Sequence, residues 1–111
     1  MNDAEIIYMV GIDCKAQYEE EFNIWYDKIH IPLLLKFKGL KRVSRYELSN
    51  GNKGYPAYLA VYEFSSKKIF EQYLKSPERA AALEEMRSRW DSGEWQIQWQ
   101  THYELLKRWG D

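Results

Sequence analysis

The spacing of hydrophobic residues changes along the chain, and its first part predicts a strand followed by a long helix. From Glu5 to Asp13 nearly every position is apolar, which is typical of a strand with both faces largely buried. From about Ala16 the apolar positions recur three and four residues apart, as in an amphipathic helix. The apolar face of that helix consists of Phe22, Trp25, Tyr26, Ile29 and Leu33.

Local signals mark the course and the end of this helix. Three glutamates at positions 19–21 lie in its first turns, where the helix dipole favours negative charge. Pro32 removes a backbone donor and pushes Ile31 away from helical angles, so we expect a kink or a new turn there. Gly39 then ends the segment.

Two strands joined by a turn should follow. Lys41 to Ser49 predicts the second strand of the chain, and Ala57 to Phe64 predicts the third. Residues 50–54 (Asn-Gly-Asn-Lys-Gly) are rich in types that adopt left-handed backbone conformations, which predicts the turn between them. One side of the third strand carries Tyr58, Ala60, Tyr62 and Phe64.

The rest of the chain predicts a second helical segment and a last strand. The serines at 65–66 can cap a short helix, and residues 76–78 (Ser-Pro-Glu) start another that runs to about Trp90. After Gly93, the stretch from Trp95 to Leu106 alternates between apolar and polar side chains. Its apolar side consists of Trp95, Ile97, Trp99, Tyr103 and Leu105, and its polar side of Gln96, Gln98, Gln100, His102 and Glu104.

The predicted order of elements is βαββαβ, without repeats or linkers, over a single domain of residues 1–111. This order fits an α+β ferredoxin-like sandwich, a four-stranded antiparallel sheet with two helical segments on one face. The first strand is apolar on both sides and the third nearly so, which means that the sheet face without helices would expose an unusually large apolar patch. We therefore expect a homodimer that forms through that sheet face.

Composition sharpens this interpretation. Five Trp, nine Tyr and four Phe exceed the needs of one small core, which favours an interface or a ligand cavity, although an aromatic-rich core remains the alternative. A net charge of −1 argues against nucleic acid as a partner. The single Cys14 cannot form an internal disulfide, and no signal peptide or membrane-spanning run is present, so we expect a cytoplasmic protein.

The most informative stretch runs from Phe22 to Leu33 and contains His30, Ile31 and Pro32 ahead of Leu33. Together with Gly39-Leu40 and the strand residue Tyr46, it resembles the EthD-like branch of the dimeric α/β-barrel superfamily. Ile31 and Lys38 depart from that pattern, where a small residue and a proline are common. The resemblance implies a dimeric α/β barrel with a pocket in each protomer. Relatives include lactone isomerases, polyketide cyclases, cofactor-free monooxygenases and accessory proteins of ether degradation.

His30 is the candidate catalytic residue. Imidazole is the side chain whose ordinary pKa allows proton transfer near neutral pH, and Asp27 lies three residues earlier, where it can orient the ring. The alternative is that His30 closes the helix surface and bonds a backbone carbonyl. Candidate ligand contacts, from the excess of aromatics and the polar side of the last strand, are Tyr8, Tyr26, Tyr46, Trp99 and His102. Plain packing is the alternative for the tyrosines, and an exposed strand face for His102.

Other chemistries find little support in the sequence. No glycine-rich phosphate loop, zinc spacing or nucleophile elbow is present, and no motif indicates a metal or another cofactor. The element order also suits an RNA-recognition module, which Lys53-Gly54-Tyr55 imitates. However, Pro56 and Ala57 stand where that module needs a small residue and a stacking aromatic.

The resemblance and His30 lead to one expectation about function. The chain is expected to bind a small apolar or aromatic carbonyl compound and to act on it as a cofactor-independent isomerase, cyclase or monooxygenase. The alternative is a non-catalytic accessory or binding module, and RNA binding is a remote third.

Overall fold

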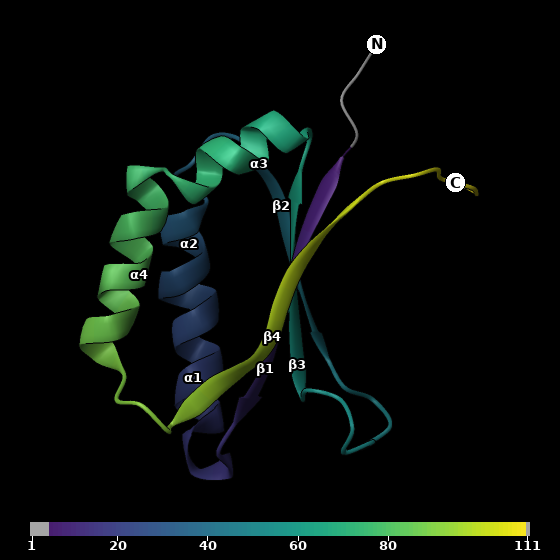
Figure 1. Cartoon of the computed structure of the whole chain (residues 1–111). Helices are drawn as coiled ribbons and strands as arrows, with labels where there is room; N and C mark the ends of the chain where they lie inside the picture. The colour runs from purple at the N-terminus through teal and green to yellow at the C-terminus, as the bar shows by residue number, and fades with distance from the viewer. Residues whose placement is uncertain (1–4, 111) are drawn as a thin grey trace.

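The computed structural model describes residues 5–110 and contains one sheet with helices packed on a single side of it (Figure 1). Its strands and α-helices lie close to the predicted ranges. They are β1 (Ile6–Cys14), α1 (Glu19–Trp25), α2 (Ile31–Leu34), β2 (Leu40–Glu47), β3 (Tyr58–Phe64), α3 (Lys67–Leu74), α4 (Pro77–Arg89) and β4 (Trp95–Glu104).

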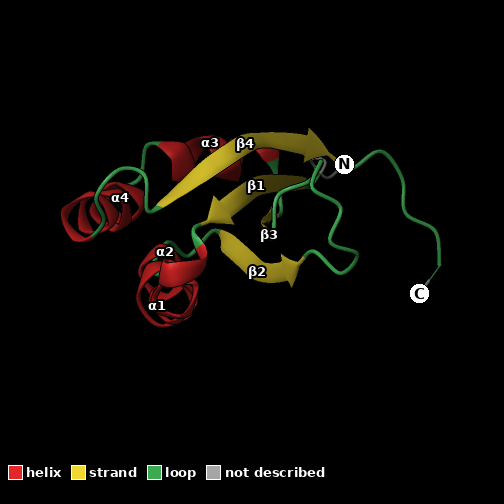
Figure 2. Ribbon diagram, turned by 90° about the horizontal axis from the view of Figure 1, so that it is seen from below, coloured by secondary structure: helices red, strands yellow, loops and turns green. Residues whose placement is uncertain are grey.

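The sheet has the strand order β2-β3-β1-β4, and every neighbouring pair is antiparallel. Figure 2 shows the strands in this order, from β4 to β2, as a twisted layer. Each half of the chain contributes a helical segment between two strands, so β1 and β3 lie in the centre and β2 and β4 at the edges. The predicted α+β ferredoxin-like fold is confirmed.

The first helical segment changes its hydrogen-bonding pattern where the sequence predicted a kink. A 3-10 turn (Ala16–Tyr18) leads into α1, a π turn (Tyr26–His30) follows, and α2 completes the segment. Pro32 has no N–H for the carbonyl of Lys28, and its ring crowds that carbonyl. In the π turn the N–H of Ile31 instead reaches back five residues to the carbonyl oxygen of Tyr26. Such turns are rare in proteins and frequently mark functional sites.

The core lies between the helices and the inner face of the sheet, by which we mean the face that the helices cover. Phe22 of α1, Ile6 of β1 and Phe64 of β3 are fully buried there. The second helical segment is fixed by two serine caps, because Ser66 accepts a hydrogen bond from the N–H of Ile69 and Ser76 one from the N–H of Arg79.

Strand β4 does not alternate along its whole length as predicted. Gly11 pairs with Trp99, but the next residue of β1, Ile12, pairs with Ile97, so Gln98 is an extra residue in a β-bulge. A bulge moves the following side chains to the opposite faces. Trp95 and Ile97 therefore share the inner face with Gln100 and His102, whereas Trp99 and Tyr103 lie on the other.

Within residues 5–110 the outer face of the sheet carries no helix. On its central strands it presents mostly apolar side chains, with charged residues near the ends of the strands at Asp13 and Glu63. Its register pairs Met9 with Val61 and Ile7 with Glu63 in β1 and β3. At its edge, Trp99 is 40% exposed and Tyr103 is 58% exposed. The apolar and aromatic residues of this outer face are Ile7, Met9, Tyr46, Leu59, Val61, Trp99 and Tyr103. No helix within residues 5–110 is long and apolar enough to cross a bilayer.

Candidate functional site

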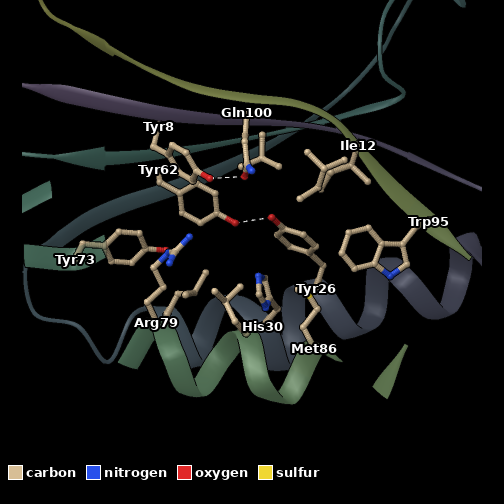
Figure 3. Close-up of a pocket in the computed structure, with 14 residues that line it drawn as sticks. Tyr8, Ile12, Tyr26, His30, Tyr62, Tyr73, Arg79, Met86, Trp95 and Gln100 are labelled. Carbon is tan, nitrogen blue, oxygen red and sulfur yellow. Dashed lines mark hydrogen bonds between the residues drawn. The ribbon is translucent and has the colours of Figure 1, made fainter. Parts of the chain in front are cut away.

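A pocket of about 70 Å³ opens between the inner face of the sheet and the helices (Figure 3). Ile97 and Gln100 of β4 lie at its exposed side, and α2 and α4 form the opposite wall. A cavity of roughly 150 Å³ accommodates benzene in other proteins, so the enclosed part suits a small group or a few atoms of a larger ligand. The lining residues are Tyr8, Val10, Ile12, Tyr26, His30, Leu34, Tyr62, Tyr73, Arg79, Leu83, Met86, Trp95, Ile97 and Gln100.

His30 projects from the last position of the π turn into this pocket and is only 6% exposed. Its ring stacks on Trp25 with centroids 4.7 Å apart and meets the ring of Tyr26 at 4.9 Å. The buried Nδ1 atom has no hydrogen-bond partner among residues 5–110. Burial lowers the pKa of His30 to about 4, against an opposing effect of Glu85, so the imidazole is neutral at pH 7.

Glu85 of α4 fixes the surface on which His30 stacks. Its carboxylate accepts a hydrogen bond of 2.9 Å from the indole N–H of Trp25 and one of 2.6 Å from Nε of Arg89. Since Trp25 is 2% exposed and held by this bond, its ring is a rigid platform under the imidazole. Glu85 thus acts on the pocket through Trp25.

Tyrosine hydroxyls form the polar part of the pocket on the sheet side. Tyr26 and Tyr62 hydrogen-bond each other through their hydroxyls, and Tyr8 donates to Oε1 of Gln100 at 2.5 Å (Figure 3). Burial raises the pKa of Tyr26 to about 12 and also raises the pKa of Tyr62 and Tyr73. These phenols therefore stay protonated at neutral pH and serve as neutral hydrogen-bond groups.

Arg79 brings the one formal charge among the lining residues, because His30 is neutral and no Asp or Glu lines the pocket. It lies in the first turn of α4, where the Ser76 cap and Pro77 fix the start of the helix. Its Cζ atom lies 5.9 Å from the ring centroid of Tyr73, and Figure 3 shows the guanidinium beside that ring. Among residues 5–110, Arg79 forms no salt bridge.

Of the candidate residues from the sequence, the structure brings together His30, Tyr8 and Tyr26. Asp27 is not in this pocket and does not orient His30, because it is exposed and its Oδ1 lies 2.8 Å from NH1 of Arg45. The expected one-turn spacing assumed an α-helix. In the wider π turn, residues three apart no longer lie one above the other.

The other three candidates lie elsewhere. Trp99 and Tyr46 occupy the outer face of the sheet, Trp99 after the bulge in β4 and Tyr46 after a second register shift between Leu40 and Arg42. His102 is on the inner face but packs on Phe70, with ring centroids 4.8 Å apart, and does not line the pocket.

Sequence reasoning missed Arg79 and Tyr73. A signal for Arg79 existed, because the first turn of a helix favours acids and a cation there opposes the helix dipole. Tyr73 carried no such signal and belonged to an ordinary apolar helix face.

A second, shallower hollow lies around Arg45 at the open side of β2. Its polar groups satisfy one another: Arg45 bonds Asp27 and Asn23, Asn23 donates to the hydroxyl of Tyr58, and that hydroxyl donates to Glu19. No cluster of three or more potential metal-binding side chains occurs within the described residues.

One known family matches the sequence across most of this fold. The family described as "Domain of unknown function (DUF4286)" matches residues 5–98, from β1 into β4 and including the whole helical layer. This chain belongs to DUF4286. Among curated proteins, none matches the sequence of this DUF4286 member significantly.

Solved structures share the fold at low sequence identity. An EthD family protein from Bacillus halodurans matches with a TM-score of 0.67 and 13% identity, over 91% of this chain and 99% of that chain. SnoaB from Streptomyces nogalater, described as a cofactor-independent oxygenase, matches with a TM-score of 0.60 and 11% identity, over 96% of each chain. A dimeric ferredoxin-like protein of unknown function from Jannaschia has a TM-score of 0.60 and 14% identity, over 91% of this chain and 99% of that chain. This DUF4286 chain therefore has the ferredoxin-like fold of EthD-like proteins.

Proposed function

We propose that this DUF4286 protein is a homodimer in which each protomer binds a small carbonyl compound beside His30 and moves a proton on it without a cofactor. The observation that carries the proposal is the buried imidazole in the pocket, neutral and with an unpartnered Nδ1. An orphaned polar atom in a protein interior costs about 1–3 kcal/mol, and a ligand that bonds it recovers that cost. The small volume of the enclosed space favours a small or partly inserted compound.

The proposed chemistry is proton transfer next to a carbonyl group. A nitrogen of His30 takes the proton from the carbon beside the carbonyl, and the electron pair of that C–H bond moves onto the carbonyl oxygen to give an enolate. The pKa of His30 in this pocket is about 4, which makes it a weak base. The negative charge that develops beside it raises that pKa during the step. Isomerisation, cyclisation and oxygenation of such compounds share this first step, and SnoaB supports the cofactor-free version on this fold.

The homodimer is proposed from the outer face of the sheet. Its apolar side chains across β1, β3 and β4 form the kind of patch that soluble proteins cover with a partner. The chain after β4 extends away from the body and exposes Leu106 at 99% and Trp109 at 77% (Figure 1). A second copy, docked sheet to sheet, covers both, and the Jannaschia protein, described as dimeric, supports a dimer of this fold.

Sedimentation tests the homodimer. We expect the wild type at micromolar concentration to sediment at twice the chain mass of 13.4 kDa. Val61→Lys, in the middle of the outer face, should dissociate it, whereas Gln72→Lys on the exposed side of α3 should not. A wild type that sediments only as a monomer would contradict the dimer.

The exchange of carbon-bound hydrogen for deuterium tests the reaction. The probes are 2-butanone and acetophenone in D2O, and NMR follows the signals of the protons beside the carbonyl. The wild type should accelerate the exchange of at least one probe, and His30→Gln should slow it by about 10²-fold or more because a general base contributes 10²–10⁴-fold. His102→Gln, outside the pocket, is the matched control.

One observation favours the second candidate function, a non-catalytic binding module. The low pKa of His30 suits a hydrogen-bonding group better than a base. Probe binding without accelerated exchange would support this module and contradict the enzyme.

A further inference from the structure

Arg79 gives the pocket a charge that the proposed function does not yet use. It is half-buried against tyrosine rings, and each salt bridge within residues 5–110 joins other side chains. A cation that is partly removed from water normally acquires an acidic partner, since its desolvation is otherwise uncompensated. Here the pocket lining contains no carboxylate that can supply one.

The other polar residues of the pocket lining are also compatible with a negatively charged ligand. One hydroxyl of the Tyr26–Tyr62 pair donates its hydrogen to the other hydroxyl. The accepting hydroxyl therefore keeps its own hydrogen for another acceptor. Because burial raises the pKa of both tyrosines, they stay neutral donors and do not compete with a ligand for the charge of Arg79. His30 is neutral as well, so the charge of Arg79 is the one formal charge in the pocket lining.

The apolar residues of the lining indicate the chemistry of the uncharged part of the ligand. Ile12, Leu83 and Met86 face the pocket from β1 and α4, and Trp95 closes it at one end (Figure 3). A fully hydrated inorganic anion gains nothing from such a wall, whereas an organic acid buries its hydrocarbon part against it.

We propose that the pocket selects small organic carboxylates, and that the Arg79 guanidinium binds the carboxylate while the hydrocarbon part of the ligand lies on the apolar wall beside His30. Arginine suits this role because its planar fork can bind both oxygens of a carboxylate. The inference rests on the proposed function and narrows its substrate to a carbonyl compound that also carries a carboxylate. The charge of the bound ligand also helps His30, since a nearby negative charge stabilises the imidazolium.

Matched pairs of an acid and its neutral amide test the inference. The probes are butyrate with butyramide, and benzoate with benzamide, titrated into the protein of residues 1–111 by calorimetry at pH 7. We expect the acid to bind about 10- to 100-fold more tightly than its amide, the range of one charged hydrogen-bonded contact. Arg79→Gln should reduce that preference to two-fold or less.

Two further variants make the result interpretable. Arg79→Met removes the charge but keeps an unbranched apolar stem, so it supplies a second neutral variant if Arg79→Gln does not fold. Arg87→Gln, on the exposed surface of the same helix, should keep the wild-type preference.

The outcomes separate this inference from the proposed function. Equal binding of acid and amide, or a preference that survives the loss of Arg79, would overturn the carboxylate inference and leave the small-molecule pocket standing. Failure of all four probes to bind the wild type at millimolar concentration would contradict both.

Discussion

Two arginines meet tyrosine rings on the inner side of the sheet, and their surroundings differ in one respect. Arg45 lies 4.6 Å from the ring centroid of Tyr26 and also bonds Asp27 and Asn23, each at 2.8 Å. Arg79 lies 5.9 Å from the ring centroid of Tyr73 and has no acidic partner within the described residues. The polar groups around Arg45 are thus hydrogen-bonded to one another. At the pocket end, by contrast, the charge of Arg79 has no acidic partner and the Nδ1 atom of His30 has no hydrogen-bond partner among the described residues. A cation without a counter-charge and an unpartnered buried nitrogen that persist in a stable fold point to a ligand.

The largest effect expected from this comparison is on stability at the satisfied end. Arg45→Met should lower the free energy of unfolding by about 2–4 kcal/mol, because it breaks two charged hydrogen bonds and leaves Asn23 and Asp27 without their partner. Urea denaturation measures this change. Arg42→Met is the matched control, since its exposed pair with Glu63 contributes less than about 1 kcal/mol. Equal effects of the two substitutions would remove the distinction between a built network and a surface charge.

The next effect concerns the pH dependence of stability at the pocket end. Folding lowers the pKa of His30 from 6.5 to about 4, so the unfolded chain takes up the proton first as the pH falls. The contribution of the neutral His30 to the free energy of unfolding is fully present above pH 6.5 and is lost as the pH falls toward 4. Between pH 7 and pH 5 the wild type should lose about 2 kcal/mol more than His30→Gln.

The pH experiment has its own control in the second histidine. His102→Gln is the matched substitution, because His102 is exposed and does not line the pocket. Indistinguishable pH profiles for the wild type and His30→Gln would show that the imidazole is not desolvated as described.

The smallest effect on stability is expected at Arg79, and a small effect would indicate that Arg79 is not part of the structural framework. In the absence of ligand, Arg79→Met should change the free energy of unfolding by less than about 0.5 kcal/mol in either direction, since no ion pair is lost and the apolar stem is kept. Denaturation without added ligand measures it. A loss as large as that of Arg45→Met would assign Arg79 to the structural framework.

The sequence was sufficient for the elements and their order, because each had its own periodicity and end signals. The apolar run of β1 and the cap at Ser76 are local properties, and the structure retains both. Even the break before Pro32 followed from the chemistry of one residue, although its π-helical form did not.

The candidate site was harder to predict, because the direction of a side chain depends on non-local pairing. Tyr46 and Trp99 each follow an irregularity in their strand, and one extra residue transfers everything beyond it to the other face. Asp27 was placed by an α-helical spacing that the π turn does not keep. Arg79 was missed because the absence of an acidic partner is a property of the folded pocket, invisible in a linear sequence.

The chain has two histidines, and this allows a direct test of whether the pocket around His30 and Arg79 binds a small organic ligand. NMR of the imidazole resonances during titration with benzoate or butyrate, assigned with His102→Gln, reports on His30 alone. We expect the His30 signals to move with a carboxylate in the wild type and to stay fixed in Arg79→Gln, while the His102 signals stay fixed in both proteins. His30 signals that remain unchanged at saturating carboxylate would contradict this expectation.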